Sequence, residues 1–355
     1  MGREIVGLKI GTSKLAAARV DVNGSRRLLQ IATRPLPSGV VSGGEVRDVE
    51  QLSHELRELF TINKLSRRAV RAGVSTNRVA VRTIELGGIH DPKQLGNAVR
   101  FRAQEALPIP LTEAVLDYQV LSEGIDDEGQ KVYRVQFAVA YRDLVDGYAT
   151  ACVNAGIRLV GIDLEAFALL RALTPLSPPP ADGEQSALVA ISIGAERATL
   201  AVTDGTVCEF TRVLDWGGNA LTAAIVQELQ IEPEQAERLK RAMSLNPDAP
   251  ISAGLDIKQV ETAREVVGTV LQGFARDLVS SLQFYQSQPG SLGFREIVLA
   301  GGTSMFDGLA ETLTRAIAVA VRVGDPLVNL RGGNKIRGAE PDPSHAIAIG
   351  LGMGI

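Results

Sequence analysis

The same short pattern occurs twice in this chain, once near its start and once just past its middle. The first copy is VGLKIGTSK at 6–14, and the second is VAISIGAER at 189–197. Each copy is an apolar run that ends in a glycine after isoleucine, with a cation three residues later. Each leads into a second apolar run that reaches a turn with glycine, Asn23-Gly24 or Asp204-Gly205. Two such β-hairpins at the heads of two halves indicate a duplicated α/β fold.

A segment rich in proline, at 174–185, separates the two halves. Strand-like and helix-like runs alternate on both sides of it, and 115–122 with 131–141 alternate like half-exposed antiparallel strands. Asp48 is followed by Gln51 three residues later, which predicts the start of a capped helix. The apolar spacing at 257–286 predicts a long amphipathic helix. We therefore expect two α/β units joined by a linker.

Composition excludes several classes of protein. A chain of 355 residues is long enough for two or three domains, each with its own core. Its 37 Lys and Arg against 41 Asp and Glu give a net charge of −4, which argues against a protein that coats nucleic acid or an anionic membrane. Two distant cysteines, Cys152 and Cys208, form no disulfide framework and fit a reducing compartment.

Further sequence signals narrow the location and the chemistry. The longest apolar runs, such as 187–191 and 297–300, are far shorter than the ~20 residues of a membrane-spanning helix. No signal peptide is expected at the start of the chain. His54, His90 and His345 are scattered, so no metal site and no catalytic triad are predicted. The expectation is a cytoplasmic protein without nucleic acid partners and without direct insertion into a membrane.

The glycine turns indicate a phosphate-binding cleft. Glycine at Gly11 and Gly194 lets backbone N–H groups approach a phosphate without a Cβ in the way. Two such turns that face each other could hold a nucleoside triphosphate between two lobes. A third apolar run ends in the turn 301–303, and Glu237 and Lys240 share one face of a predicted helix. Taken singly, each feature is more typical of a plain turn or of a solvent-exposed ion pair.

In this order, the segments resemble the actin-like ATPase superfamily and, within it, the PilM family of type IV pilus assembly proteins. Residues 7–13 and 191–195 resemble its two phosphate motifs, and 301–303 resemble its adenosine loop. Segments that are more specific to the PilM family are 106–111, 115–120, 161–169 and 281–285. The resemblance implies that the nucleotide-binding residues are Gly11, Thr12, Ser13, Gly194, Ala195, Glu237, Lys240, Gly301, Gly302 and Thr303.

The resemblance also implies the architecture. It is an actin-like, ribonuclease H-like duplicated α/β fold of two lobes, with an inserted subdomain in the first lobe as in FtsA. The first lobe is expected to comprise 1–84, 161–180 and 343–355. The inserted subdomain is expected at 85–160, and the second lobe at 186–342.

The chain departs from the family at two positions that matter for catalysis. Both phosphate motifs normally carry Asp two residues before the glycine, where this chain has Lys9 and Ser192. The family organises Mg²⁺ and its waters through those carboxylates, and Mg²⁺ needs such oxygen ligands. We therefore expect ATP as a candidate ligand, no Mg²⁺ site, no catalytic residue and no active ATPase.

Several side chains near the motifs have more than one interpretation. Lys9 could meet a phosphate as a point charge, or pair with Asp163 or Glu165 and fill the site without a ligand. The simplest role for Asp163 and Glu165 is helix capping. Lys14 and Arg197 are most simply exposed cations of the turns, with a role toward phosphate left open.

The function implied by the resemblance is that of a scaffold in the inner-membrane alignment complex of the type IV pilus. Such proteins bind the cytoplasmic N-terminal peptide of the membrane protein PilN and link that complex to the motor, at the cytoplasmic face of the inner membrane. One alternative is an active ATPase of the same family, with metal held by other carboxylates such as Asp163. Another is the equivalent component of a type II secretion or competence pseudopilus system.

Overall fold

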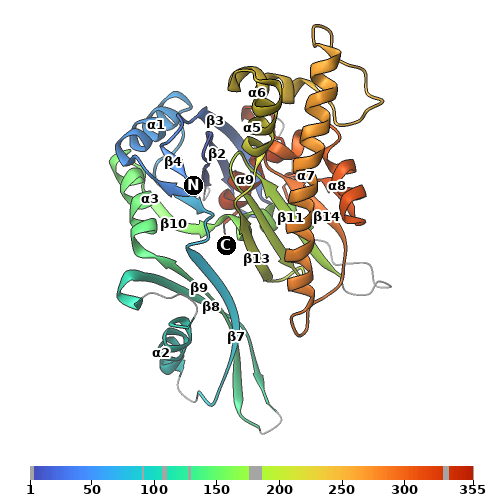
Figure 1. Cartoon of the computed structure of the whole chain (residues 1–355). Helices are drawn as coiled ribbons and strands as arrows, with labels where there is room; N and C mark the ends of the chain where they lie inside the picture. Colours follow the sequence, from blue (N-terminus) through green and yellow to red (C-terminus); the bar gives the residue numbers. More distant parts are fainter. Residues whose placement is uncertain are drawn as a thin grey trace.

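The computed structural model describes residues 4–89, 92–105, 110–126, 129–175, 186–330 and 336–354. Two α/β lobes lie beside each other, and a smaller subdomain projects from one end of the molecule (Figure 1). Most of the linker predicted at 174–185 and part of the predicted motif at 106–111 lie outside the described residues. None of the described helices is long and apolar enough to cross a membrane.

The first lobe is built on a six-stranded sheet in the order β10-β6-β1-β2-β3-β16. Helices cover both faces, so β1 and β2 are almost continuously buried rather than alternating. On one face lie α1 and α3, and α9 lies on the other. Its elements are β1 Glu4–Ile10, β2 Lys14–Asp21, β3 Arg27–Pro35, β6 Val70–Val74, β10 Leu159–Leu164, β16 Arg337–Gly338, α1 Val49–Ile62, α3 Arg142–Asn154 and α9 Ala346–Gly352.

Local sequence signals set the start of α1. Asp48 is the N-cap, and its side chain accepts a hydrogen bond from the backbone N–H of Gln51 at 2.8 Å, as the sequence predicts. Just before it, Val41–Ser42 (β4) and Glu45–Val46 (β5) form a separate two-stranded hairpin. This hairpin, with Gly43 and Gly44 at its tip, was not predicted.

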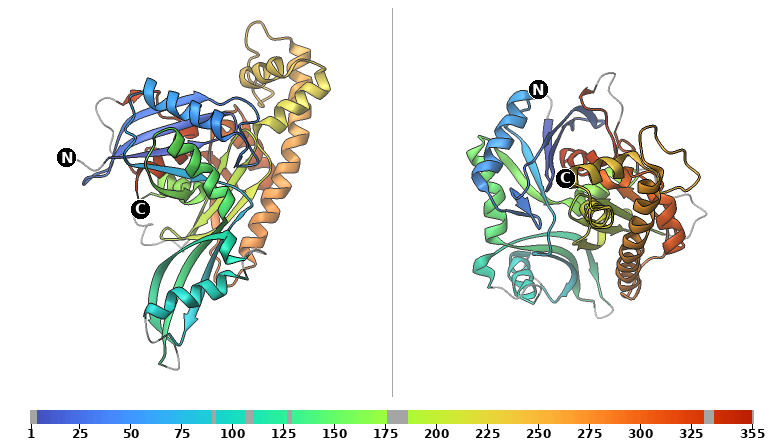
Figure 2. Two further views of the ribbon diagram at one scale, coloured as in Figure 1. Left: turned by 90° about the vertical axis from the view of Figure 1, so that its left-hand side faces the viewer. Right: turned by 45° about the horizontal axis from the view of Figure 1, so that its top comes forward.

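The second lobe repeats the plan with a five-stranded sheet in the order β13-β12-β11-β14-β15. Its outer face is covered by helices, among which α7 runs the length of the lobe (Figures 1 and 2). The apolar face predicted for this helix is buried in the core of the lobe, from Val260 to Leu282. The elements are β11 Ala187–Ile193, β12 Ala198–Thr203, β13 Cys208–Leu214, β14 Phe294–Ala300, β15 Ala320–Val323, α5 Gly218–Leu229, α6 Pro233–Ala242, α7 Ile257–Gln286 and α8 Leu309–Ile317.

Two short helices join the sheets at the centre of the molecule. In α4 (Glu165–Leu173) the apolar side chains pack on β11 and β12 of the second lobe, while α9 packs on the first sheet. The two helices also pack against each other. The described residues also include three short 3₁₀ turns, Leu111–Glu113, Gly302–Met305 and Pro343–His345. The two lobes therefore share one apolar junction on the far side of their sheets.

The projecting subdomain is a three-stranded antiparallel sheet in the order β7-β9-β8, covered on one face by α2. Its elements are β7 Val79–Gly87, β8 Ala114–Ile125, β9 Lys131–Tyr141 and α2 Pro92–Ala103. By contrast, α3 packs against α1, with Leu144, Tyr148 and Cys152 buried in the first-lobe core. We propose that the subdomain comprises 79–141 rather than 85–160, because the apolar face of α3 is already covered in the first lobe.

After the second lobe, the chain also returns to the first lobe earlier than the sequence predicts. Arg337 and Gly338 pair in parallel with Gln30 and Ile31 of β3, before the expected return at 343. We propose that the second lobe ends before 336 and that 336–354 belong with the first lobe.

Candidate functional site

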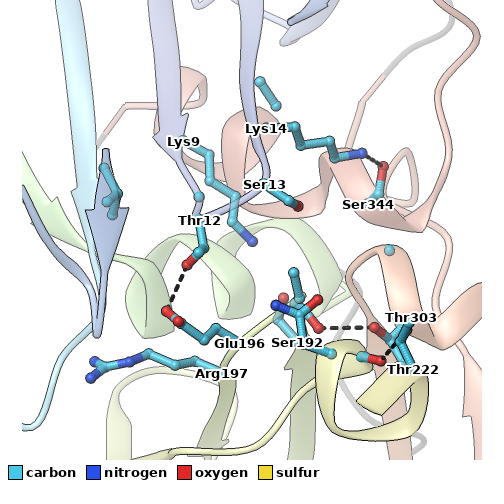
Figure 3. Close-up of a pocket in the computed structure, with 18 of the residues that line it drawn as sticks. Lys9, Thr12, Ser13, Lys14, Ser192, Glu196, Arg197, Thr222, Thr303 and Ser344 are labelled. Carbon is cyan, nitrogen blue, oxygen red and sulfur yellow. Dashed lines mark hydrogen bonds between the residues drawn. The ribbon is translucent and has the colours of Figure 1, made fainter. Parts of the chain in front are cut away.

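The two predicted glycine hairpins meet across a cleft of about 1060 Å³ between the lobes. In each hairpin the glycine N–H closes the turn, from Gly11 to the Lys14 carbonyl at 3.1 Å and from Gly194 to the Arg197 carbonyl at 2.8 Å. The predicted site residues that line the cleft are Lys9, Gly11, Thr12, Ser13, Ser192, Gly194, Ala195, Glu237, Lys240, Gly302 and Thr303. Figure 3 shows side chains of both hairpins facing this space. Gly301, the remaining predicted residue, does not line the cleft and lies against Ile193 of β11.

Lys9 projects from β1 toward the start of α4. Its Nζ lies 3.7 Å from Oε2 of Glu165, and only 15% and 8% of the two side chains are exposed. Burial raises the pKa of Glu165, while Lys9 and, less strongly, Arg197 act in the opposite direction. Of the two partners considered for Lys9, the structure selects Glu165. The Asp163 carboxylate instead pairs with Arg171, and it does not line the cleft.

Helix capping is a wrong interpretation of both acids. The N-cap of α4 is Leu164, and no side chain caps this end of the helix. Asp163 accepts a hydrogen bond from the N–H of Leu164, its direct neighbour, at 2.8 Å. Glu165 lies in the first turn, and its carboxylate contacts Lys9. Asp163 stabilises the lobe junction through Arg171, and Glu165 belongs to the cleft.

The phosphate end of the cleft does not fit a magnesium ion. Mg²⁺ requires oxygen ligands in near-octahedral geometry. Lys9 offers an ammonium, which only donates hydrogen bonds, and Ser192 offers one hydroxyl. The two neighbouring carboxylates are already engaged, Glu165 with Lys9 and Glu196 with Thr12, Ser42 and Gly43. The residues present can hold an anion through N–H, hydroxyl and ammonium donors.

Lys14 and Arg197 are not the exposed turn cations that the sequence favours. The ammonium of Lys14 donates to Oγ of Ser344 at 2.8 Å. Burial lowers the pKa of Lys14, against the opposing effect of Asp342. The Arg197 side chain is 17% exposed and reaches the first lobe, where Nη1 donates to the carbonyl of Ser75 at 3.2 Å. Arg197 therefore links the two walls of the cleft, whereas Lys14 is fixed within the first lobe.

The other end of the cleft is assembled from α5, α6 and the loop after β14. Lys240 is buried, and its Nζ donates to the Gly218 carbonyl at 3.0 Å and to Oγ1 of Thr222 at 2.7 Å. Thr222 in turn donates to Oε2 of Glu237 at 2.7 Å. Partial burial works against ionisation of Glu237, yet hydrogen bonds from Lys240, Thr222 and Arg241 hold its pKa below the usual value. Glu237 and Lys240 are thus part of a hydrogen-bonded network with Thr222 and not a solvated pair.

The predicted adenosine loop is fixed to the second hairpin. Thr303 donates through Oγ1 to the carbonyl of Gly194 at 2.9 Å. Gly301 has φ +88°, and a Cβ there would lie 2.3 Å from the carbonyl oxygen of Ile193. Only glycine allows the loop to pass this close to β11.

Four groups of this site were missed by the sequence interpretation: Thr222, Glu196, Ser344 and the β4–β5 turn at Ser42-Gly43-Gly44. The turn had a readable signal, because two glycines between apolar residues are typical of a tight β-hairpin. The other three are single polar side chains whose side-chain partners lie from 15 residues away, for Thr222 and Glu237, to 330 residues away, for Ser344 and Lys14. No local pattern identifies such partners.

Comparison with known proteins gives the family. Residues 7–354 match the family described as type IV pilus assembly protein PilM. A solved structure described as a PilM-PilN type IV pilus biogenesis complex is 26% identical, with a TM-score of 0.79, and the match covers 100% of both chains. MreB5 of Spiroplasma citri bound to ADP is 13% identical, with a TM-score of 0.55 over 98% of this chain and 94% of that chain, a likeness of fold alone.

Curated relatives agree with this fold. The cell division protein FtsA of Escherichia coli (strain K12) is 24% identical over 388 residues, which cover 98% of this chain and 89% of FtsA. FtsA of Pseudomonas aeruginosa is 25% identical over 362 residues, covering 92% and 84%. The predicted actin-like fold is confirmed, and the chain belongs to the PilM family of type IV pilus assembly proteins.

Proposed function

We propose that this protein is a scaffold of the type IV pilus assembly machinery that works by binding a peptide and not by hydrolysing ATP. Its partner is the cytoplasmic N-terminal peptide of a PilN-like membrane protein, which holds it at the cytoplasmic face of the inner membrane beside the other pilus components. Membership of the PilM family and the full-length similarity to a protein solved as a PilM-PilN complex support this partner.

The observation that carries the proposal is the buried pair of Lys9 and Glu165. Phosphoryl transfer depends almost wholly on positioning and on a metal that bridges the phosphates. Here a lysine stands where the family organises that metal, and its Nζ lies 3.7 Å from Oε2 of Glu165. ATP remains a candidate ligand, held by hydrogen bonds and by cations of the chain, but Mg²⁺-dependent turnover is not expected with Lys9 and Ser192 at the two motif positions.

An active ATPase is the second candidate, and one observation favours it. Glu237, Thr222 and Lys240 form a hydrogen-bonded network in the cleft, and Thr303 fixes the neighbouring loop, which supports a nucleotide-binding role for these residues. The version that places the metal on Asp163 is not supported, because that carboxylate pairs with Arg171 away from the cleft. A type II secretion or competence component would differ by binding the corresponding peptide of that system.

The test is a titration of a fluorescent ATP analogue, in Mg²⁺ and in EDTA, on the native chain and on the double variant Lys9→Asp/Ser192→Asp. We expect the native chain to bind equally in both buffers or not at all, and the double variant to gain metal dependence. An affinity near ~1 μM corresponds to about −8 kcal/mol, so a metal contribution is easily resolved. Lys131→Asp/Ser122→Asp makes the same changes in the projecting subdomain and serves as the matched control.

The peptide arm of the proposal is tested separately. A synthetic peptide with the N-terminal sequence of the PilN-like protein from the same genome is titrated against the native chain without nucleotide. We expect binding without ATP and without Mg²⁺. Binding of ATP by the native chain only with Mg²⁺, or a Mg²⁺-dependent ATPase rate that disappears when Gly11 or Gly194 is substituted, would replace the scaffold by the enzyme.

A further inference from the structure

The second hairpin places a carboxylate against the first lobe. Glu196 follows Gly194 and Ala195 at the tip of this hairpin. Its Oε2 accepts hydrogen bonds from Oγ1 of Thr12 at 3.0 Å and from the backbone N–H of Gly43 at 2.9 Å. Its Oε1 accepts one from Oγ of Ser42 at 3.2 Å. All three donors belong to the first lobe, and Figure 3 shows Glu196 reaching up to Thr12 from the opposite wall of the cleft.

The three donors form a site for an anion. Two are hydroxyls and one is a backbone N–H, and such groups bind carboxylate or phosphate oxygens alike. Within the part of the chain that the structure describes, Glu196 forms no ion pair with a lysine or an arginine, so these neutral donors carry the interaction. Thr12 is also one of the residues predicted to contact a nucleotide. A phosphate group and the Glu196 carboxylate therefore compete for the same hydroxyl.

The β4–β5 turn is shaped to make this contact. Gly43 and Gly44 have φ +62° and +69°, the left-handed conformation of a tight hairpin turn. A Cβ on Gly44 would lie 2.2 Å from the Ser75 carbonyl oxygen and 2.8 Å from Nη1 of Arg197. The bare backbone thus packs against Arg197, the residue after Glu196, and this contact directs the Gly43 N–H at the carboxylate.

We propose that Glu196 is an internal anionic ligand of the cleft. Its carboxylate occupies the donors of Thr12, Ser42 and Gly43, which would otherwise receive the phosphate end of a nucleoside di- or triphosphate, and it latches the two lobes together without a nucleotide. The chain itself thus supplies two charged groups at this end of the cleft. Glu196 is the anion on these donors, and Lys9, held beside Glu165, is the cation. The latch goes beyond the scaffold function, because it concerns the closure of the cleft and not the partner peptide.

Hydrogen exchange read by mass spectrometry tests the latch in the full chain without ligand. Glu196→Ala is expected to speed exchange in the peptide covering 37–48 roughly tenfold or more, because it removes hydrogen bonds to a charged acceptor. Glu196→Gln keeps the shape and loses the charge, so an intermediate effect is expected. Glu234→Ala is the matched control, since Glu234 lines the cleft and, among the residues that the structure describes, has no hydrogen bond or ion pair with the first lobe. Unchanged exchange in Glu196→Ala, or an equal rise in the control, overturns the latch.

Competition is measured with inorganic pyrophosphate in EDTA, by calorimetry. Glu196→Ala is expected to bind pyrophosphate at least about tenfold more tightly than the native chain, the change that about 1.4 kcal/mol produces. If exchange rises but the affinity does not, Glu196 is not a competitor for the phosphate site and the proposal fails. Should Glu196→Ala fold poorly, the same two measurements on Glu196→Gln decide. Neither measurement involves the PilN-like peptide or Mg²⁺, so its outcome is independent of the scaffold proposal.

Discussion

The two hairpins of the cleft have the same backbone and different chemistry. Each pairs its last apolar strand residues with the next strand in the same register, Lys9 opposite Ala16 and Ser192 opposite Thr199. In the first lobe, the residue before the turn is a lysine that neutralises a buried carboxylate. In the second lobe it is a small buried serine, and the charged residues Glu196 and Arg197 reach out of the turn to the opposite lobe.

The two hairpins thus share the features that build the sheets and differ in the side chains that line the cleft. The glycine turns and apolar strands are maintained in both halves because they build the sheets. The charged side chains differ: Lys9 contacts a carboxylate of its own lobe, whereas Glu196 and Arg197 reach from the second hairpin to the first lobe. Lys240 contacts α5 of the second lobe, and Thr303 joins the loop after β14 to the second hairpin.

The largest expected difference between the hairpins comes from removing the charge of Lys9. Lys9→Met leaves Glu165 buried without its cation and is expected to lower the free energy of unfolding by about 3–5 kcal/mol at pH 8. The equivalent Ser192→Ala is expected to cost less than about 1.5 kcal/mol. Urea unfolding measures both. Equal losses would show that Lys9 carries no electrostatic role.

The pH dependence of that loss follows from Glu165. Burial raises the pKa of Glu165 in the folded state. Above that folded pKa the ionised carboxylate destabilises the folded chain. This loss of stability disappears as the pH falls toward the unfolded pKa near 4.5. The difference between Lys9→Met and the native chain is therefore expected to shrink from pH 8 to pH 5. A constant difference would contradict this cause. The double variant Lys9→Met/Glu165→Gln is expected to recover most of the loss at pH 8.

A medium effect is expected at the glycine that supports the second hairpin. Gly301→Ala places a Cβ 2.3 Å from the Ile193 carbonyl oxygen at φ +88°, and is expected to cost at least about 1–3 kcal/mol. Gly302→Ala is the adjacent control, because nothing lies within 4 Å of its Cβ position, and it is expected to stay within about 0.5 kcal/mol. Thermal and urea unfolding compare them. Similar losses would mean that the strain at Gly301 is not the cause.

The smallest expected effect is a pH dependence of stability that arises beside the first hairpin and not beside the second. His345 is buried next to Ser344, the partner of Lys14, and its Nδ1 accepts a hydrogen bond from the backbone N–H of Asp342 at 3.2 Å. Burial lowers the pKa of His345, with Lys14 and Lys9 adding to this and Asp342 opposing it. A lowered folded pKa means that stability is full above about 6.5 and is lost as the pH falls below it.

Between pH 7.5 and 5.5 the native chain is therefore expected to lose more stability than His345→Gln, by about 1 kcal/mol or less. Thr303→Val, which removes the hydroxyl that contacts the second hairpin, should cost the same at both pH values. Urea unfolding at the two pH values measures the difference. If His345→Gln shows the same pH dependence as the native chain, the imidazole does not titrate in this range.

Much of the fold could be predicted because its signals are local. The capped start of α1 at Asp48, the buried stripe of α7 and both glycine hairpins are found as the pattern predicts. The boundary of the projecting subdomain was harder to predict from the sequence, because the amphipathic pattern of α3 is the same whether this helix packs on the subdomain or on α1. Only the packing of Leu144 and Tyr148 in the first-lobe core distinguishes the two.

The sequence by itself determined the repeated hairpins, the positions of the glycine turns and the residues that stand two positions before each glycine, Lys9 and Ser192. These are properties of residue type and short spacing. The tertiary structure decided which acid meets Lys9, that Lys14 and Arg197 are half-buried with partners rather than exposed cations, and that Glu196 faces the first lobe. Such contacts join residues from 122 to 330 positions apart. Only the packing of the two sheets against α4 and α9 brings these residues together, and no local propensity encodes that arrangement.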